Sequence, residues 1–307
     1  MQNLLVVGIC LALGLLLQRV RAFPAQHAAS ALNAFVVYVA LPALILVAVP
    51  RLELGAGLLA PVLIPWLVLG VTAGAVVVLA RARGWSRGVR GALLMVVPLA
   101  NTSFLGIPLT EAWLGRSAVP WAVLYDQLGS FLALTIYGSF VIATHAPGAT
   151  RRPRAAELAR RVVAFPPFLA LLGALVVKAV APEGLPPTLT GALGAIAASL
   201  VPTVMVAVGL QWRVALAREE LGPTAFALIV KLALAPVVAW VALRALGLHG
   251  AAADASVFEA AMGPMITAGA LAVAADLEPR LVAAVVGYGT VLSLATTAVV
   301  HAMLLPL

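Results

Sequence analysis

Long apolar stretches recur along this chain of 307 residues. A helix needs about 20 consecutive apolar residues to cross the hydrocarbon core of a bilayer, and the stretches approach or exceed this length. Charged residues make up only 10% of the chain, whereas soluble domains average about a quarter. The sequence therefore predicts an all-α polytopic membrane protein with ten transmembrane helices, at residues 3–18, 29–49, 57–80, 90–115, 118–144, 165–181, 187–210, 221–243, 255–275 and 280–305.

The net charge of +8 is explained by where the basic residues lie. If the N-terminus is outside and the spans alternate, the cytoplasmic loops hold Arg19, Arg21, Arg81, Arg83, Arg87, Arg90, Arg151, Arg152, Arg154, Arg160, Arg161, Arg213, Arg218 and Arg280. The outer side holds only Arg51, Arg116, Lys178 and Arg244. This positive-inside bias orients membrane proteins. We therefore expect a multi-pass protein of the plasma (inner) membrane with both termini outside, in contact with the lipid bilayer and with no nucleic-acid partner.

The first apolar stretch is expected to remain as a helix and not to be removed as a signal peptide. No basic residue precedes it, and Arg19 and Arg21 follow it, as in an uncleaved first helix with its N-terminus outside. The single cysteine, Cys10, allows no intrachain disulfide and no cysteine-built metal site. We expect no cofactor and no metal, because the four histidines are scattered over loops and span ends, at His27, His145, His249 and His301.

The longest hydrophilic stretch, residues 145–164, divides the ten predicted spans into five and five. We interpret it as a solvated cytoplasmic linker between a first repeat at 1–144 and a second at 165–307. The halves share prolines and glycines at nearly constant offsets, in the pairs Pro42 and Pro202, Gly129 and Gly289, and Pro98 and Pro264. Because each half has an odd number of spans, the second must be inserted upside down relative to the first. Such inverted repeats recur in secondary transporters.

One apolar span contains polar and helix-breaking residues, reading PLANTSFLGIPL from Pro98 to Leu109. This stretch resembles the fourth-helix signature of the auxin efflux carrier family, which includes plant PIN-formed carriers and bacterial organic-anion permeases. LPALIL from Leu41, LYDQLGSFL from Leu124 and VKLALAPVV from Val230 resemble its second, fifth and eighth helices. The family usually has glycine just before the Asn and often another two residues after it, where this chain has Ala100 and Ser103.

The resemblance implies ten helices in two inverted five-helix repeats, with broken crossing helices 4 and 9. It implies a scaffold from helices 1, 2, 6 and 7, here residues 1–50 and 165–212. A moving transport part would comprise the other six helices, residues 57–144 and 221–307. Members of the family carry carboxylate-bearing anions by an elevator-like motion, and they often form homodimers through the scaffold.

The broken backbone itself points to a binding site. Irregular backbone at membrane depth survives only where it is buried or lines a cavity. Asn101 lies roughly 16 Å into its span at 1.5 Å per residue, near the middle of the membrane, and Thr267 reaches a similar depth from the other side. Helix N-termini at the two breaks would attract a carboxylate. The alternative is that Pro98 and Pro264 only kink their helices and that Asn101 satisfies a freed carbonyl.

These arguments give the candidate residues. Substrate binding is assigned to Asn101, Thr102, Ser103, Thr267, Gln127 and Lys231, and the helix breaks to Pro98, Gly106, Pro108 and Pro264. Tyr125 and Ser130 either line the same cavity or simply pack.

Ionisable residues inside spans are functional candidates because the bilayer makes them costly. Asp126 and Lys231 lie at similar depths, so an ion pair between them is possible. It would be either a structural bridge or a charge neutralised when substrate or a proton binds. Glu259 is either an interfacial carboxylate or a group that couples transport to H⁺ or Na⁺.

The leading hypothesis is a secondary active transporter of a small carboxylate-bearing organic anion, such as an auxin-like compound or a dicarboxylate. The alternative of the same class is a sodium-coupled symporter of the bile-acid type, whose fold is related. A passive channel is a further alternative. An enzyme is not expected, because the chain has no Gly-x-Ser-x-Gly with a mid-span His.

Overall fold

The computed structural model describes residues 2–52, 55–148, 154–181, 184–212 and 218–304. Within these ranges every named element is a helix, and the one extended pairing is an isolated bridge between Ala100 and Pro264. Six helical stretches of the described chain are long and apolar enough to cross a membrane, and a bent pair of helices adds a possible seventh. The protein is therefore an all-helical, polytopic membrane protein, as the sequence predicts.

The elements of the N-terminal half differ widely in length, from three-residue turns to the 24 residues of α4. In chain order they are α1 (Gln2–Gln18), α2 (Ala25–Phe35), η1 (Val36–Ala40), α3 (Leu41–Ala48), η2 (Val49–Arg51), η3 (Ala56–Leu58), α4 (Leu59–Ala82), α5 (Arg87–Val96), η4 (Thr102–Gly106), α6 (Ile107–Leu114), α7 (Val119–Tyr125), η5 (Asp126–Phe131), η6 (Leu134–Gly138) and α8 (Ser139–His145).

The C-terminal half continues with α9 (Ala155–Val163), α10 (Pro166–Val180), α11 (Pro187–Ala198), α12 (Leu200–Gln211), η7 (Arg218–Glu220), α13 (Leu221–Ile229), η8 (Val230–Leu234), α14 (Ala235–Ala245), α15 (Ala251–Ala260), α16 (Ile266–Ala274) and α17 (Pro279–Leu304). Of the elements marked η, five are π-helical turns, namely η1, η4, η5, η6 and η8.

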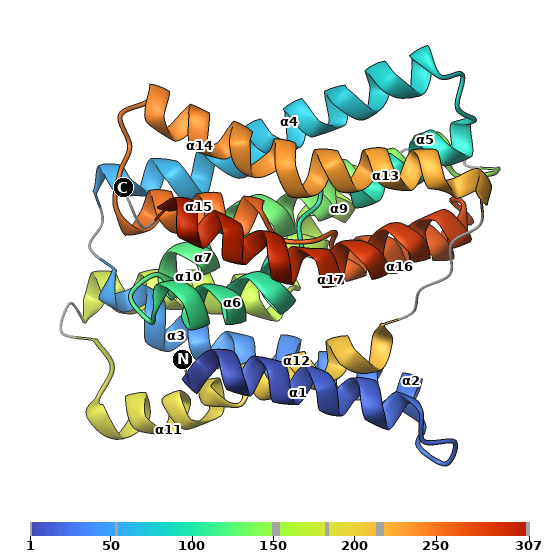
Figure 1. Ribbon diagram of the computed structural model, residues 1–307. Helices are drawn as coiled ribbons and strands as arrows, with labels where there is room; N and C mark the ends of the chain where they lie inside the picture. Colours follow the sequence, from blue (N-terminus) through green and yellow to red (C-terminus); the bar gives the residue numbers. More distant parts are fainter. Residues whose placement is uncertain (1, 53–54, 149–153, 182–183, 213–217, 305–307) are drawn as a thin grey trace.

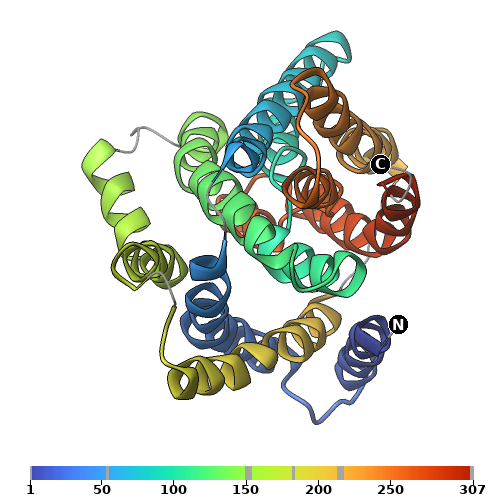
Figure 2. The same cartoon turned by 90° about the vertical axis from the view of Figure 1, so that its left-hand side faces the viewer.

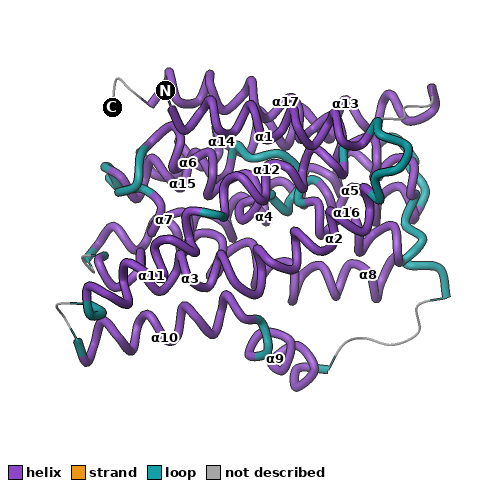
Figure 3. The backbone as a smooth tube through the Cα atoms, turned by 90° about the horizontal axis from the view of Figure 1, so that it is seen from below, coloured by secondary structure: helices purple, strands orange, loops and turns teal. Residues whose placement is uncertain are grey.

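Most helices run roughly along one direction, so the connections gather at two ends of the molecule (Figure 1). One end contains the α1–α2, α4–α5 and α16–α17 connections, and we call it the basic face because Arg19, Arg81, Arg83 and Arg280 lie there. The α10–α11 and α14–α15 connections lie at the other end, toward which α1 begins and α17 ends. The tube view from below shows the same division (Figure 3). This arrangement gathers those four arginines at one end of the molecule.

The helices fall into two groups when the molecule is viewed along their length (Figure 2). In one group α1 and α2 pack on α12, and α10 and α11 pack on α3. In the other, α4, α7 and α14 surround α15, while α5 packs on α16 and α17. Contacts between the groups include α1 with α6 and α12 with η4. The segments that carry the predicted site therefore lie in the second group, facing the first.

Large apolar side chains cover the outside of the helices. Ile9, Val78 and Ile229 are each about two-thirds exposed, at 66%, 69% and 65%. Surfaces this apolar are rare on soluble monomers. Val78 and Ile229 lie in helical stretches long enough to span a bilayer, and Ile9 lies in a shorter apolar helix. The outer surface is therefore suited to contact with lipid.

The predicted linker at 145–164 differs from expectation in one respect. Its residues 155–163 form the helix α9, which contains no buried residue and is bent by 68° from α10. Pro166 and Pro167 account for the bend, because proline lacks the N–H that would continue a helix and restricts the residue before it. Residues 149–153 of the predicted linker lie outside the described residues.

Candidate functional site

Two interrupted segments meet at the centre of the second group. The first interruption separates α5 from η4, and the second separates α15 from α16. The Asn101 N–H donates to the Gly263 carbonyl at 2.9 Å, and the Met265 N–H donates to the Leu99 carbonyl at 2.9 Å. This antiparallel pairing supplies hydrogen-bond partners to backbone groups that are outside a helix and away from water. Buried polar groups require such partners. The structure thus brings together the breaks predicted around Pro98 and Pro264.

We call the place where the two interruptions meet, residues 97–101 and 261–265, the crossing. Glycines allow α17 to pack directly on it. A Cβ on Gly263 would lie 2.8 Å from the Gly289 carbonyl oxygen. A Cβ on Gly289 would lie 2.3 Å from the Cδ of Pro264. These separations are below van der Waals contact, so only glycine fits without a shift of the backbone. The crossing is therefore stabilised by its backbone hydrogen bonds and by the packing of α17 against it.

Asp126 is the centre of a buried hydrogen-bond cluster beside the crossing. Its Oδ1 accepts hydrogen bonds from the Thr102 hydroxyl and, at 2.6 Å, from the Ser103 hydroxyl. Its Oδ2 accepts one from the Gln127 amide at 2.7 Å. Ser103 occupies a position where the family often has glycine, and here its hydroxyl adds a donor to this carboxylate. The cluster joins two π-helical turns, η4 and η5, an irregularity that is frequent at functional sites.

Glu259 is completely buried. Its Oε1 accepts a hydrogen bond from the Thr110 hydroxyl at 3.0 Å, while its Oε2 has no partner among the described residues. Gly106 makes room for it, because a Cβ there would lie 1.8 Å from Oε2. The carboxyl group therefore fits against the helix that follows the first break. Pro108 is the second residue of α6, which continues directly from η4, so the chain is helical on both sides of Gly106 and Pro108 and is not broken there.

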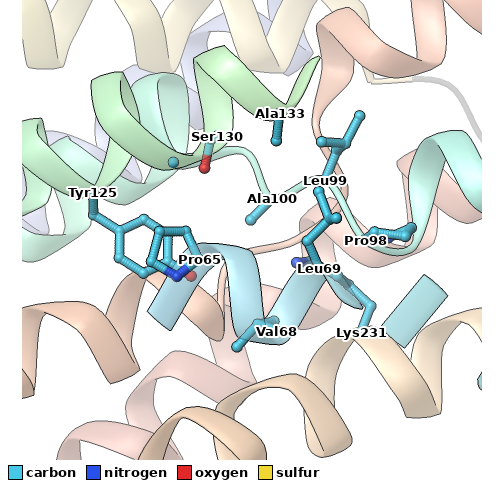
Figure 4. Close-up of a pocket in the computed structure, with 11 residues that line it drawn as sticks. Pro65, Val68, Leu69, Pro98, Leu99, Ala100, Tyr125, Ser130, Ala133 and Lys231 are labelled. Carbon is cyan, nitrogen blue, oxygen red and sulfur yellow. The ribbon is translucent and has the colours of Figure 1, made fainter. Parts of the chain in front are cut away.

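Lys231 lies on the other side of the crossing, next to Pro98, Leu99 and Ala100 (Figure 4). It is 0% exposed, and its Nζ has no hydrogen-bond partner among the described residues. It lines a cavity of about 10 Å³, roughly the size that holds one water molecule. Tyr125 and Ser130 line the same cavity. Within the described part of the chain Asp126 and Lys231 form no ion pair, because the hydroxyl and amide donors occupy the carboxylate instead.

Asn101 and Thr267, the two remaining predicted binding residues, differ in burial. Asn101 is 2% exposed; its carbonyl accepts hydrogen bonds from Leu105 and Gly106, whereas its side-chain Nδ2 is buried without a partner in the described chain. Thr267 lies in the first turn of α16 and its side chain is exposed. The structure therefore brings Asn101, Thr102, Ser103 and Gln127 to the crossing, and it leaves Thr267 outside the buried cluster.

Residues 1–301 match the family model described as "Membrane transport protein". The chain belongs to this family. It is the auxin efflux carrier family that the fourth-helix motif resembles. A relative from Methanothermobacter thermautotrophicus, described as an uncharacterized transporter, is 30% identical over 273 residues, which cover 88% of this chain and 87% of the relative.

In this membrane transport protein, two cavities separate the helix groups on the side of the basic face. One has a volume of about 450 Å³ and lies between α2 and α12 on one wall and α16 and α17 on the other. The second, of about 180 Å³, shares Gln211, Ile266, Ala283 and Val286 with the first. Both reach Ile266, the first residue of α16, so they extend to the crossing.

The cavity walls contain polar residues that the sequence analysis did not select. Gln26, Ser30, Asn33 and Gln211 line the larger cavity, and the Asn33 amide donates to Gln211 Oε1 at 3.3 Å. Their polarity could have identified them in the sequence. They lie near the ends of apolar spans, however, where polar residues are expected in any case. Among the described residues, no group of three or more His, Cys, Asp or Glu is placed to hold a metal ion.

Proposed function

We propose that this protein is a secondary active transporter that moves a small organic anion bearing a carboxylate across the membrane. The observation that carries the proposal is the crossing, where the buried side-chain amide nitrogen of Asn101, Nδ2, has no partner among the described residues. Two helical segments begin there, η4 at Thr102 and α16 at Ile266. The first N–H groups of a helix have no intrahelical acceptor and carry partial positive charge. Together with the Asn101 amide they would bind a carboxylate.

Lys231 would add long-range attraction for the anion. It carries the only basic side chain that is fully buried in the described chain, and it lies against the Ala100 side of the crossing. Its charge would favour an anion at the crossing without touching it, because electrostatic interactions are strong in a medium of low polarity. Binding would therefore depend on both the helix termini and this lysine.

The transport movement would be that of the α4–α8 and α13–α17 group against the group of α1–α3 and α10–α12. In this reading the chain crosses the membrane ten times, as two inverted repeats of five spans. The fourth span comprises α5 with η4 and α6, and the ninth comprises α15 with α16. The separation of the groups in Figure 2 and the cavities between them support this division. The described arrangement would give the anion access from the basic face.

Glu259 and Asp126 are the groups that would couple transport to an ion. Glu259 has a buried oxygen without a partner among the described residues, which is costly for a charged carboxylate unless it binds a proton or a cation. This observation also supports the second candidate, a sodium-coupled symporter of the bile-acid type. Transport driven by a pH gradient and unaffected by sodium would eliminate the sodium-coupled alternative.

The test is binding to the purified protein, followed as thermal stabilisation by a panel of monocarboxylates and dicarboxylates, with indole-3-acetate included. A ligand at 100 times its Kd stabilises the folded state by about 2.7 kcal/mol. We expect the stabilisation to be lost in Asn101→Ala and kept in the control Thr144→Ala, which changes a half-buried hydroxyl whose hydrogen bonds stay within α8. Equal stabilisation of both variants would show that the anion binds elsewhere.

The coupling ion is tested by repeating the panel at two pH values, with and without sodium. We expect Glu259→Gln to remove the dependence on pH, because the amide cannot exchange a proton. If sodium strengthens anion binding in the wild type and not in this variant, the sodium-coupled symporter is the correct reading. If neither ion alters binding in any variant, Glu259 has no coupling role.

A further inference from the structure

Two adjoining cavities lie on the lipid-facing side of α14, α15 and α17, away from the crossing. One, of about 170 Å³, has polar walls that include Arg244, His249 and Asp254. The other, of about 300 Å³, is lined almost entirely by apolar groups from the same three helices and η8. Trp240 and Val257 line both cavities, so the polar and apolar spaces adjoin. The helices that form them lie together near the end of α17 in Figure 1.

The apolar cavity has the length and exposure of a groove for an acyl chain. It extends along the chain from Leu232 to Trp240, about 12 Å at the helical rise of 1.5 Å per residue. This is close to half of a hydrocarbon core about 30 Å thick. Val237 and Val299, on its walls, are 51% and 59% exposed. The groove therefore opens toward the surrounding lipid.

The polar cavity places one cation and one anion where the apolar groove ends. The Arg244 guanidinium lies over the Trp240 ring, 5.5 Å from its centroid. Among the described residues Arg244 forms no ion pair, although Asp254 lines the same cavity. Tryptophan is enriched at the level of lipid headgroups, where its ring is apolar and its N–H is polar. We therefore take Trp240 as the marker of the headgroup level in this proposal, with both charges lining the cavity beside it.

We propose that the joined cavities bind one phospholipid whose headgroup is a primary amine, of the phosphatidylethanolamine type. Its phosphate would pair with Arg244, and its ammonium would donate to the Asp254 carboxylate. One acyl chain would occupy the groove beside Val237 and Val299. A headgroup with only negative charge would be repelled by the Asp254 carboxylate. A choline headgroup has no N–H to donate to that carboxylate.

Native mass spectrometry of the purified full-length protein tests this lipid site. The protein is incubated with phosphatidylethanolamine, its N-methyl and N,N-dimethyl forms, phosphatidylcholine and phosphatidylglycerol, and the retained lipid is counted. We expect one retained phosphatidylethanolamine, with retention falling at each added methyl group and lowest for phosphatidylcholine and phosphatidylglycerol. Equal retention of all five lipids overturns the proposal without any variant being needed.

The variants assign the binding to these residues. We expect Arg244→Ala and Asp254→Asn each to weaken phosphatidylethanolamine binding roughly tenfold, as the loss of a charge-assisted pair does. Val299→Trp should block the groove. The control is Arg116→Ala, because Arg116 is an exposed arginine at the same end of the molecule that pairs with Glu111. Wild-type retention in both headgroup variants, or equal weakening in the control, overturns the assignment.

Discussion

Gly106 is the glycine of the site at which an added Cβ would approach another atom most closely. Its Cβ would lie 1.8 Å from Glu259 Oε2, a contact that the fully buried carboxyl cannot avoid without moving. We therefore expect Gly106→Ala to destabilise the protein by about 1–3 kcal/mol, the usual cost of overpacking. Thermal unfolding in detergent measures this effect.

The matched control for Gly106 is Gly74→Ala in α4, where no atom lies within 4 Å of the added Cβ. This variant should unfold at the wild-type temperature or slightly above it, since alanine favours a helix more than glycine does. If the two variants unfold at the same temperature, the close contact between Gly106 and Glu259 is not present in the membrane protein.

Replacing the Lys231 ammonium by an apolar group should raise stability and weaken anion binding. A buried ammonium without a partner is costly, and the Lys231 Nζ has none in the described chain. Lys231→Met keeps the apolar stem, so we expect the empty protein to unfold at a higher temperature while anion binding weakens. Thermal unfolding with and without the anion measures both effects. A variant that is less stable and binds the anion normally would show that Lys231 has a purely structural role.

The places where the helices are interrupted could be predicted from the sequence, but the rotation of side chains about the helix axis could not. Asn101 and Thr102 are at the crossing because their motif breaks the helix there. Asp126 and Lys231 were placed at similar depths, yet they do not pair. Each lies in a π-helical turn, which rotates the following residues relative to an α-helix. Rotation also explains Thr267, which follows the second interruption but has an exposed side chain.

At the scale of elements, α1 and α12 meet through glycines. A Cβ on Gly14 would lie 2.3 Å from the Val206 carbonyl oxygen, and one on Gly209 would lie 2.5 Å from the Leu11 carbonyl oxygen. Small residues allow such close backbone packing between helices in membranes. Gly14→Ala should therefore separate the helices and lower the free energy of unfolding by about 1–3 kcal/mol.

The control for this contact lies in the same helix. Gly8→Ala adds a methyl group to α1 with no atom within 4 Å, and it should leave stability unchanged or improve it. Thermal unfolding of the two variants under identical conditions compares them. Wild-type stability in Gly14→Ala would contradict the close α1–α12 packing.

The sequence predicted elements where it contains a strong local signal. Prolines and the polar run from Asn101 marked the interruption before η4, and Pro264 marked the one before α16, because proline lacks the N–H that a continuous helix needs. The helix α9 was not predicted, since its alternation of arginine with apolar residues resembles a solvated linker when read without its neighbours. The cavities between the helix groups depend on packing between distant segments, which no local signal reports.

At the scale of the whole molecule, one hydrogen bond joins the end of α12 to α17 across the two helix groups. The Trp212 indole N–H donates to the Gly287 carbonyl at 3.0 Å. Trp212→Phe removes this donor. The net loss of about 1 kcal/mol should lower the population of the conformation in which the two helix groups have the relative position seen in this structure. We expect a cysteine introduced at Ala270, in the larger cavity, to react roughly fivefold more slowly with a thiol reagent.

This labelling is measured after Cys10→Ser has removed the native thiol. The control is Trp66→Phe, which removes a 3.0 Å hydrogen bond to the Leu128 carbonyl between elements of one group. That variant should not alter the labelling. Equal rates for the two tryptophan variants would mean that Trp212 does not hold the groups in this arrangement.

The central claim, that the crossing binds an anion and carries it across the membrane by alternating access, is tested most directly by counterflow in proteoliposomes. Vesicles are loaded with an unlabelled anion that stabilises the purified protein, and entry of the labelled anion is followed over time. The account predicts saturable entry with a transient accumulation that requires the internal anion and is lost in Asn101→Ala. Entry that rises linearly with concentration, without accumulation and equally in both proteins, would contradict it.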